Sequence, residues 1–314
     1  MNPSHSDNTG DFDEFGAYQA LALDTDSEAD DRWAFGTGFI DPLSGVDTAV
    51  PPGVPGPALA RYCLALGDDA LIYSHRLQEW LTRLPELEEE TAVANIALDL
   101  LGQARLLLSR AAAADPSLAA AGPAAAADED RLAFFREAGQ FRNVRLAERA
   151  DADFAELMAR LLVFSAWRLE LMSRLRDCPD PLLAAITARS VSELTYHRDY
   201  AAAWVVRLGD GTGYSRTRMA AGLAAVWPYV PELFTVPAVE RDLPGIAVDP
   251  DAVRGAFDSV LGAVLDAATL QRPEVPALAP VSGRTGRDGM HTEALSYLLA
   301  EMQSLARAHP DAAW

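Results

Sequence analysis

The amino-acid sequence predicts an all-α protein built around four long helices that form two antiparallel hairpins. Apolar residues recur every three or four positions over long stretches, which is the period of an amphipathic helix. No stretch alternates apolar and polar residues between turn signals in the manner of a strand. Prolines and glycines fall between the helical stretches, where each helix is expected to end.

The first predicted hairpin follows a stretch that is rich in proline. Its first helix carries an apolar stripe from Leu59 to Leu84 and ends before Pro85, which cannot continue a helix. Its second helix begins near Leu87 and runs to about Ala113. Leucines occupy most of the circumference of this second helix, so we expect it to be covered on several sides.

The second predicted hairpin follows an alanine-rich link and a short amphipathic piece over residues 132–135. Its two helices are expected at about residues 146–176 and 182–208, with prolines between them. The turns inside the hairpins are tight and the connection between the hairpins is longer, which is typical of a ferritin-like bundle with one crossover. The additional C-terminal helices are predicted over residues 215–226, 250–270 and 290–308.

The chain is predicted to hold one ferritin-like helical domain, residues 58–314, behind an N-terminal extension over residues 1–57. The extension is acidic and rich in proline and glycine, with eleven acidic residues among the first 60 against Arg32 alone. We expect it to be partly disordered, because its first ten residues offer almost no apolar surface to offset the entropy of ordering.

Composition and charge exclude several classes of function. A net charge of −20 repels phosphate backbones and anionic lipid surfaces, so neither nucleic acid nor a membrane is an expected partner. Charged residues interrupt the apolar stretches before the roughly 18 positions that a membrane span needs, and no signal peptide begins the chain, so we expect a cytoplasmic protein. All 26 basic residues are arginine. The absence of lysine excludes a pyridoxal Schiff base and a Walker A phosphate loop.

A ferritin-like bundle raises the question of a di-iron centre, which takes a Glu from each of two helices and a Glu-x-x-His pair from each of the others. The nearest match on the second helix is Asp99 followed by Gly102, which has a shorter carboxylate and lacks the imidazole. On the fourth helix Glu193 is followed by Tyr196, with His197 one position late. The sequence therefore predicts a degenerate site that holds no metal.

Counting positions from each turn gives the residues that lie level with these candidates. Asp99 falls level with the region around Asp69 on the first helix, and Glu193 falls level with Phe164 on the third helix, which offers no carboxylate in register. We therefore assign no catalytic, cofactor-binding or metal-binding residue. The polar side chains are expected to be buried and to bond one another or a buried arginine. Ordinary hydrogen bonds between helices, without any metal ancestry, remain the alternative explanation.

Several longer motifs resemble a known family. The segments that carry the resemblance are Leu66-Gly67-Asp68-Asp69-Ala70-Leu71, Ala94-Asn95-Ile96-Ala97-Leu98-Asp99-Leu100-Leu101-Gly102-Gln103-Ala104-Arg105, and Gly286-Arg287-Asp288-Gly289 with His291-Thr292-Glu293. On these motifs the chain is similar over about residues 33–314 to the C subunits of bacterial phenylacetyl-CoA epoxidase, a family also called the ring-1,2-phenylacetyl-CoA monooxygenases.

The resemblance implies a non-catalytic, ferritin-like structural subunit that pairs with a related catalytic subunit. In that family the partner holds the di-iron centre, and further subunits and a reductase with FAD and an iron-sulfur cluster complete the complex, with NADPH as the electron donor. This chain itself would hold no cofactor. The main alternative is an independently active ferritin-like di-iron oxidase or iron-binding protein. A helical acyl-CoA-binding protein is a second alternative, although its arginines would be expected in grooves and those of this sequence are dispersed over the helices.

Overall fold

The computed structural model describes residues 43, 45–235 and 242–312. The chain divides into two compact units, Met1–Ser44 and Gly45–Trp314, and the second unit contains all the helices below. Residues 45–57, which were predicted to be part of the extension, belong to this second unit. The disorder predicted for the first ten residues concerns positions outside the described residues.

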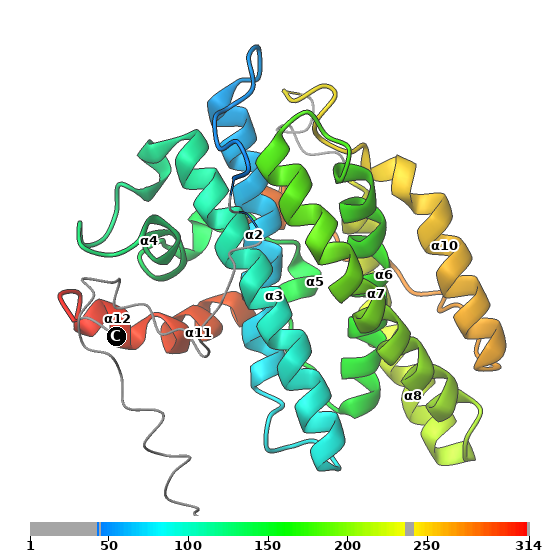
Figure 1. The fold of residues 1–314 in the computed structure, drawn as a ribbon. Helices are drawn as coiled ribbons and strands as arrows, with labels where there is room; N and C mark the ends of the chain where they lie inside the picture. Colours follow the sequence, from blue (N-terminus) through cyan, green and yellow to red (C-terminus); the bar gives the residue numbers. More distant parts are fainter. Residues whose placement is uncertain (1–42, 44, 236–241, 313–314) are drawn as a thin grey trace, which may run out of the picture. The chain divides into compact units, whose positions relative to one another are not determined.

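Four long helices form the centre of the second unit, in two antiparallel hairpins (Figure 1). The first hairpin pairs α2 (Gly56–Gln78) with α3 (Leu87–Ala114), and the second pairs α6 (Phe154–Leu175) with α7 (Pro181–Gly209). Helix α3 packs against α7, which joins the two hairpins. Over the described ranges the only β-structure is an isolated bridge between Val281 and Arg284, so the predicted all-α class is confirmed.

Shorter helices cover the two sides of this bundle. Helices α8 and α10 pack against α6 and α7, whereas α4 packs against α3 and α11 contacts α2 and α5 (Figure 1). Short 3-10 helices fill the connections between them. The elements in chain order are η1 (Pro116–Ala119), α4 (Asp128–Phe134), η2 (Ala138–Gln140), α5 (Arg145–Glu148), α8 (Gly213–Val226), η3 (Trp227–Phe234), α10 (Pro250–Ala267), η4 (Gly286–Asp288), α11 (Glu293–Met302) and α12 (Ser304–Ala308).

Two predicted helix boundaries are wrong for local reasons. Helix α2 ends at Gln78 rather than near residue 84, and Thr82 in the following turn has a φ of 74°, which lies in the left-handed region. The predicted helix over 146–176 is broken into α5 and α6. Asp153 caps α6 by accepting a hydrogen bond of 2.9 Å from the backbone N–H of Glu156. Aspartate at this position favours a new helix start over a continuous helix.

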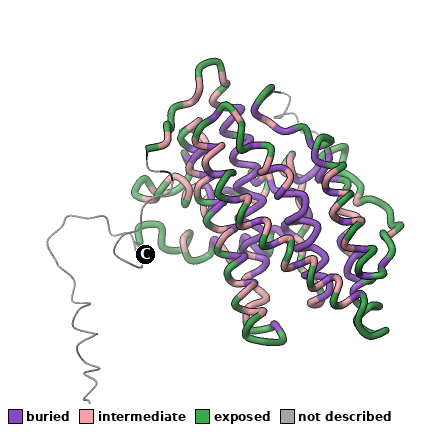
Figure 2. The backbone as a smooth tube through the Cα atoms, turned by 45° about the vertical axis from the view of Figure 1, so that its right-hand side comes forward, coloured by how far each residue is buried: buried purple, intermediate pink, exposed green. Residues whose placement is uncertain are grey.

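The four bundle helices differ in how they are buried. Residues along nearly the whole length of α2 and α6 are buried, whereas on α3 and α7 buried residues alternate with exposed ones. Figure 2 shows helices of both kinds in the second unit. The apolar character of α3 is therefore wider than its buried stripe. By length and composition alone, α3 is apolar enough to cross a membrane. One such helix is weak evidence for a membrane span, because the core helices of bundles pass the same test. In this chain 44% of the most apolar window of α3 is buried.

A buried ion pair ties the two hairpins together at one end. Arg110 on α3 and Asp180 at the start of α7 are both fully buried and hydrogen-bonded to each other. Arg110 also donates to the backbone oxygen of Thr48 at 2.7 Å, and Asp180 accepts from the backbone N–H of Leu183 at 2.7 Å. One guanidinium thus joins both hairpins to the segment that precedes α2.

The close approach of α8 to α6 depends on Gly222, and this generates a prediction. A Cβ at this position would lie 2.8 Å from the backbone nitrogen of Glu156 and 2.9 Å from the backbone carbon of Ala155. Gly222→Ala is expected to lower the free energy of unfolding by about 1–3 kcal/mol, measured by urea denaturation, because backbone must move. Gly255→Ala in α10, where the new Cβ meets nothing within 4 Å, is the matched control and should stabilise slightly. Equal effects at both positions would contradict this packing.

Candidate functional site

Two neighbouring carboxylates on α2 lie at the centre of the molecule. Asp68 and Asp69 are both completely buried. Asp68 accepts hydrogen bonds from both terminal nitrogens of the Arg136 guanidinium and, at 2.8 Å, from the backbone N–H of Arg142. Buried carboxylates need such partners to offset the loss of water. Through these hydrogen bonds, Asp68 holds the connection between the two hairpins against α2.

Asp69 makes a second set of contacts with distant parts of the chain. It accepts a backbone hydrogen bond from Val144 at 2.8 Å and two from the Arg287 guanidinium, at 3.0 and 2.7 Å. The Arg168 guanidinium lies 4.0 Å away. Burial raises the pKa of Asp69 above its ordinary value, and the charges of Arg287 and Arg168 act in the opposite direction. Two guanidinium groups thus compensate the desolvation of this carboxylate.

Arg168 of α6 places a positive charge inside the four-helix bundle. Its side chain is fully buried, donating from Nε to Oε1 of Gln103 on α3 at 3.1 Å and from Nη1 to the backbone oxygen of Leu66 on α2 at 3.1 Å. Burial lowers the pKa of Arg168 to about 10, with Asp69 opposing the shift. The group stays cationic at neutral pH, so the interior holds a permanent positive charge that three helices share.

The series of hydrogen bonds that starts at Arg168 continues from Gln103 to the outer side of α7. Gln103 Nε2 donates to Glu193 at 3.0 Å, and the opposite oxygen of Glu193 accepts from Arg189 at 3.1 Å. Glu193 is partly exposed, so this carboxylate sits between the bundle interior and the solvent. Glu193 was among the positions predicted from the sequence, whereas Gln103 and Arg168 were missed. The signal that could have found the buried cation is the charge at position 168, which lies inside the apolar run of α6.

The structure brings Asp99 and His197 together across α3 and α7. Their side chains share a hydrogen bond of 2.9 Å between Nε2 and Oδ2. His197 is buried, but 35% of the Asp99 side chain is exposed, so the predicted burial of Asp99 is wrong. The other ring nitrogen of His197, Nδ1, is buried and has no hydrogen-bond partner among the residues that the structure describes. Asp69 lies apart from this pair and bonds arginines instead.

The inward-facing positions of α3 and α7 differ by about one residue from those predicted from the sequence. Leu100 and Gln103 are buried on α3, and Leu194 and His197 are buried on α7, whereas Gly102 is exposed. Each buried pair has the three-residue spacing of Glu-x-x-His. Leucine stands at the first position of both pairs, where the motif would have glutamate. The leucines around α3 concealed which of its stripes faces inward.

These residues do not fit a di-iron centre. Two irons in such a bundle need four carboxylates and two imidazoles, and the inward positions supply leucine twice, glutamine and one imidazole. The Arg168 guanidinium would also repel a metal cation. Within the described part of the chain, carboxylates gather closely enough for one ion at Glu86, Glu88 and Glu89, which lie at the surface where α3 begins.

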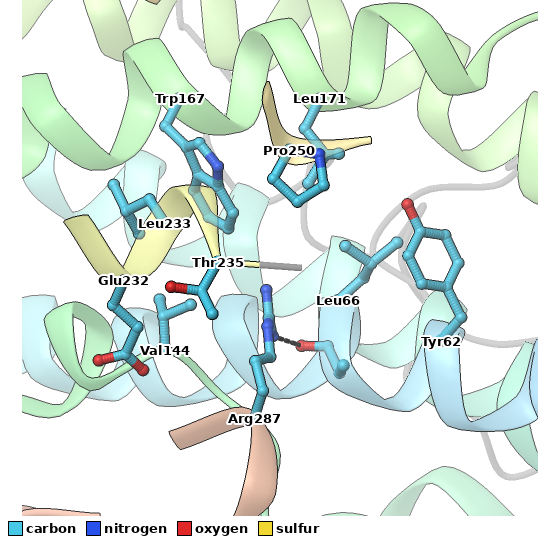
Figure 3. A pocket seen from close by; sticks show the side chains of 11 residues that line it. Tyr62, Leu66, Val144, Trp167, Leu171, Glu232, Leu233, Thr235, Pro250 and Arg287 are labelled. Carbon is cyan, nitrogen blue, oxygen red and sulfur yellow. Dashed lines mark hydrogen bonds between the residues drawn. The ribbon is translucent and has the colours of Figure 1, made fainter. Parts of the chain in front are cut away.

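The cavity next to Arg287 and the bundle helices α2 and α6 is small. It has a volume of about 20 Å³ and lies between Leu66, Trp167 and Arg287, where Arg287 donates to the backbone oxygen of Ala65 at 3.0 Å (Figure 3). A volume near 15 Å³ is enough for one water molecule. This cavity therefore has no room for an aromatic acyl group.

Comparison with known proteins gives the family. The phenylacetic acid catabolic protein family matches residues 46–314. The chain belongs to this family. A relative, the C subunit of the 1,2-phenylacetyl-CoA epoxidase of Escherichia coli strain K12, is 42% identical over 259 residues, which are 82% of this chain and 99% of the relative. The ferritin-like helical fold predicted from the connectivity is the fold of this family.

The C-terminal motif that resembles the phenylacetic acid catabolic family has a structural role in this chain. Besides the bonds from Arg287 to Asp69, His291 places Nδ1 2.7 Å from a carboxylate oxygen of Glu148 and Nε2 3.0 Å from the backbone oxygen of Phe141. Both ring nitrogens thus lie within hydrogen-bonding distance of oxygen atoms. The motif holds the C-terminal segment on α2 and α5.

Large apolar and aromatic side chains are exposed on the side of α3 and α7 that faces away from the bundle interior. Leu98 is 61% exposed and Tyr196 is 49% exposed. The rings of Tyr196 and Tyr200 stack with centroids 6.1 Å apart. We call Leu98, Leu101, Tyr196 and Tyr200 the α3/α7 outer face. Leu98 and Tyr196 immediately precede the two members of the Asp99–His197 bond.

A first prediction from this site concerns the buried cation. Arg168→Met is expected to lower the free energy of unfolding by at least about 3 kcal/mol, because the acceptors on Gln103 and Leu66 lose their donor and Asp69 loses a neighbouring charge. Urea denaturation followed by circular dichroism measures the change. Arg176→Met, at an exposed position, is the control and should stay within about 0.5 kcal/mol of wild type. A fully stable Arg168→Met variant would show that the charge is not structurally required.

A second prediction concerns metal. After anaerobic incubation with ferrous iron and desalting, the purified chain is expected to retain no stoichiometric iron, because Leu100, Leu194 and Arg168 stand where ligands are needed. Elemental analysis measures the iron, and a ferritin-like di-iron protein carried through the same procedure is the positive control. Retention of about two irons per chain would contradict the register derived above.

Proposed function

We propose that this chain is the non-catalytic structural subunit of a phenylacetyl-CoA epoxidase. The observation that carries the proposal is the interior of its bundle, where leucine, glutamine and a buried guanidinium replace the ligands of a di-iron centre. A chain that keeps the bundle but lacks the ligands is suited to supporting another subunit. The family membership and the relative, which is named as an epoxidase subunit, support the choice of this complex.

The partner in this proposal is a related catalytic subunit that holds the di-iron centre. The α3/α7 outer face supports such pairing, because it exposes leucine and tyrosine on two long neighbouring helices. Aromatic residues are enriched where proteins contact one another, and exposed apolar groups of this kind mark interaction surfaces. A ferritin-like partner would offer helices of matching length for this contact.

The remaining components follow from the same proposal. The catalytic partner would use O2 to epoxidise the aromatic ring of phenylacetyl-CoA, and a reductase with FAD and an iron-sulfur cluster would deliver electrons from NADPH. This chain would contribute no cofactor of its own. The complex would work in the cytoplasm during phenylacetate degradation.

The activity test compares three samples with reductase, NADPH and phenylacetyl-CoA present in each. This chain alone is expected to show no turnover, the catalytic chain alone is expected to be unstable or weakly active, and the mixture is expected to be active. Product formation is followed by mass spectrometry. Turnover by this chain alone would favour an independent oxidase, and full activity of the stable catalytic chain alone would remove the structural role.

A pair of variants tests where the partner binds. Leu98→Glu is expected to weaken the complex with the catalytic chain by at least about tenfold, because it places a charge in an apolar contact. Leu305→Glu changes a leucine of similar exposure, 55% against 61%, on a different helix and should bind normally. Affinity is measured by titration, and circular dichroism checks that both variants fold. Normal binding by Leu98→Glu would place the contact elsewhere.

A further inference from the structure

A second cavity lies beside α2 and shares no residue with the α3/α7 outer face. Its volume is about 330 Å³, at the lower end of the range of small-molecule sites. It is bounded by α2, η1, the connection from α4 to α5, and η4. The residues that line it are Arg61, Leu64, Ala65, Leu118, Leu132, Arg136, Gln140, Arg142, Arg287 and Asp288.

This cavity gathers arginines that lie far apart in the sequence. Four of its lining side chains are arginine and one is acidic, in a chain whose net charge is −20. Arg136 and Arg287 are each paired through two hydrogen bonds with the buried carboxylates Asp68 and Asp69. The arginines that appeared dispersed over the helices therefore converge on one site.

Arg142 differs from these paired arginines. Its Nη1 donates to the backbone oxygens of Gly139 at 2.7 Å and Phe141 at 2.6 Å, so one side of the guanidinium is fixed. A Cβ at Gly289 would lie 2.7 Å from the same nitrogen, so glycine is needed for this close packing. Among the described residues, the Nε and Nη2 groups of Arg142 have no protein partner, and no carboxylate lies within ion-pair distance. These two nitrogens form the edge that binds oxyanions with two parallel hydrogen bonds.

The electrostatic surroundings of Arg142 favour an added negative charge. Burial lowers the pKa of the Arg142 guanidinium, and the nearby charges of Arg136 and Arg284 lower it further. Asp68 and Asp288 offset part of this effect. An anion beside Nε and Nη2 would stabilise the charged form of Arg142 and reduce its repulsion with its arginine neighbours.

We propose that this cavity binds a phosphate group, with Arg142 as its main ligand and Arg61, which also pairs with Asp242, as a second cation. Arginine binds two oxygens of a phosphate through paired donors, and Leu64, Leu118 and Leu132 offer apolar contacts to the organic part of a phosphate ester. The phosphate can be inorganic phosphate or the phosphate group of an organic ester, which adenosine 3′,5′-bisphosphate represents in the test. The proposal does not depend on the proposed function, because it uses neither the bundle interior nor the α3/α7 outer face.

The test uses the full chain and isothermal titration calorimetry with two probes, inorganic phosphate and adenosine 3′,5′-bisphosphate. Saturable binding of at least one probe is expected. Arg142→Gln should weaken that binding by at least about tenfold, since it removes the charged paired donors. Arg176→Gln removes one charge at an exposed position outside the cavity and should bind like wild type. Tighter binding of the bisphosphate than of phosphate would identify the ester as the source, and equal binding would identify free phosphate.

A second variant protects the test against misfolding. Leu118→Trp fills the cavity from a partly exposed position without replacing an arginine, and it should also weaken binding by at least about tenfold. Circular dichroism and thermal melting check that each variant folds. Absence of saturable binding to wild type, or unchanged binding in a folded Arg142→Gln or Leu118→Trp variant, would overturn the proposal.

Discussion

Asp68 and Asp69 are adjacent, charged and completely buried in the middle of α2, and much of the second unit is arranged to compensate them. Isolated carboxylates at this depth would cost several kcal/mol each, so their partners are structural necessities. Those partners come from the connection after α4, from α6 and from η4. The bundle, the crossover between its hairpins and the C-terminal segment therefore meet at two neighbouring residues.

Besides two backbone N–H groups, the partners of these carboxylates are arginine side chains. A guanidinium offers five donors in a fixed plane, so one side chain can join a carboxylate to several backbone oxygens, which an ammonium group does less well. Arg76 illustrates this by bonding Glu79, the backbone oxygen of Glu148 at 2.7 Å, and the backbone oxygen of Ala294. Arg168 does the same inside the bundle. Inside the bundle, the positive charge near Asp69 is thus supplied by an arginine side chain and not by a bound metal ion.

Sequence periodicity was sufficient for the hairpins, the all-α class and the ferritin-like connectivity, because apolar stripes and helix-ending prolines are local signals. It failed at the start of α6, where the capping side chain of Asp153 overrides a continuous apolar pattern. It also placed the inward positions of α3 about one residue early, since leucines surround that helix and Gln103 gives no local hint of its burial. The four arginines around the second cavity converge only through tertiary contacts, which no local pattern encodes.

The bond between Asp69 and Arg287 spans 218 residues of the chain. At about 5–20 residues per second, a ribosome needs on the order of 10–40 s to synthesise the residues between them. During that interval the first hairpin exists without the charge that completes its centre, and its apolar faces have no finished counterpart. The contact between Asp69 and Arg287 can therefore form only after the C-terminal segment has been synthesised, so this part of the core is completed late.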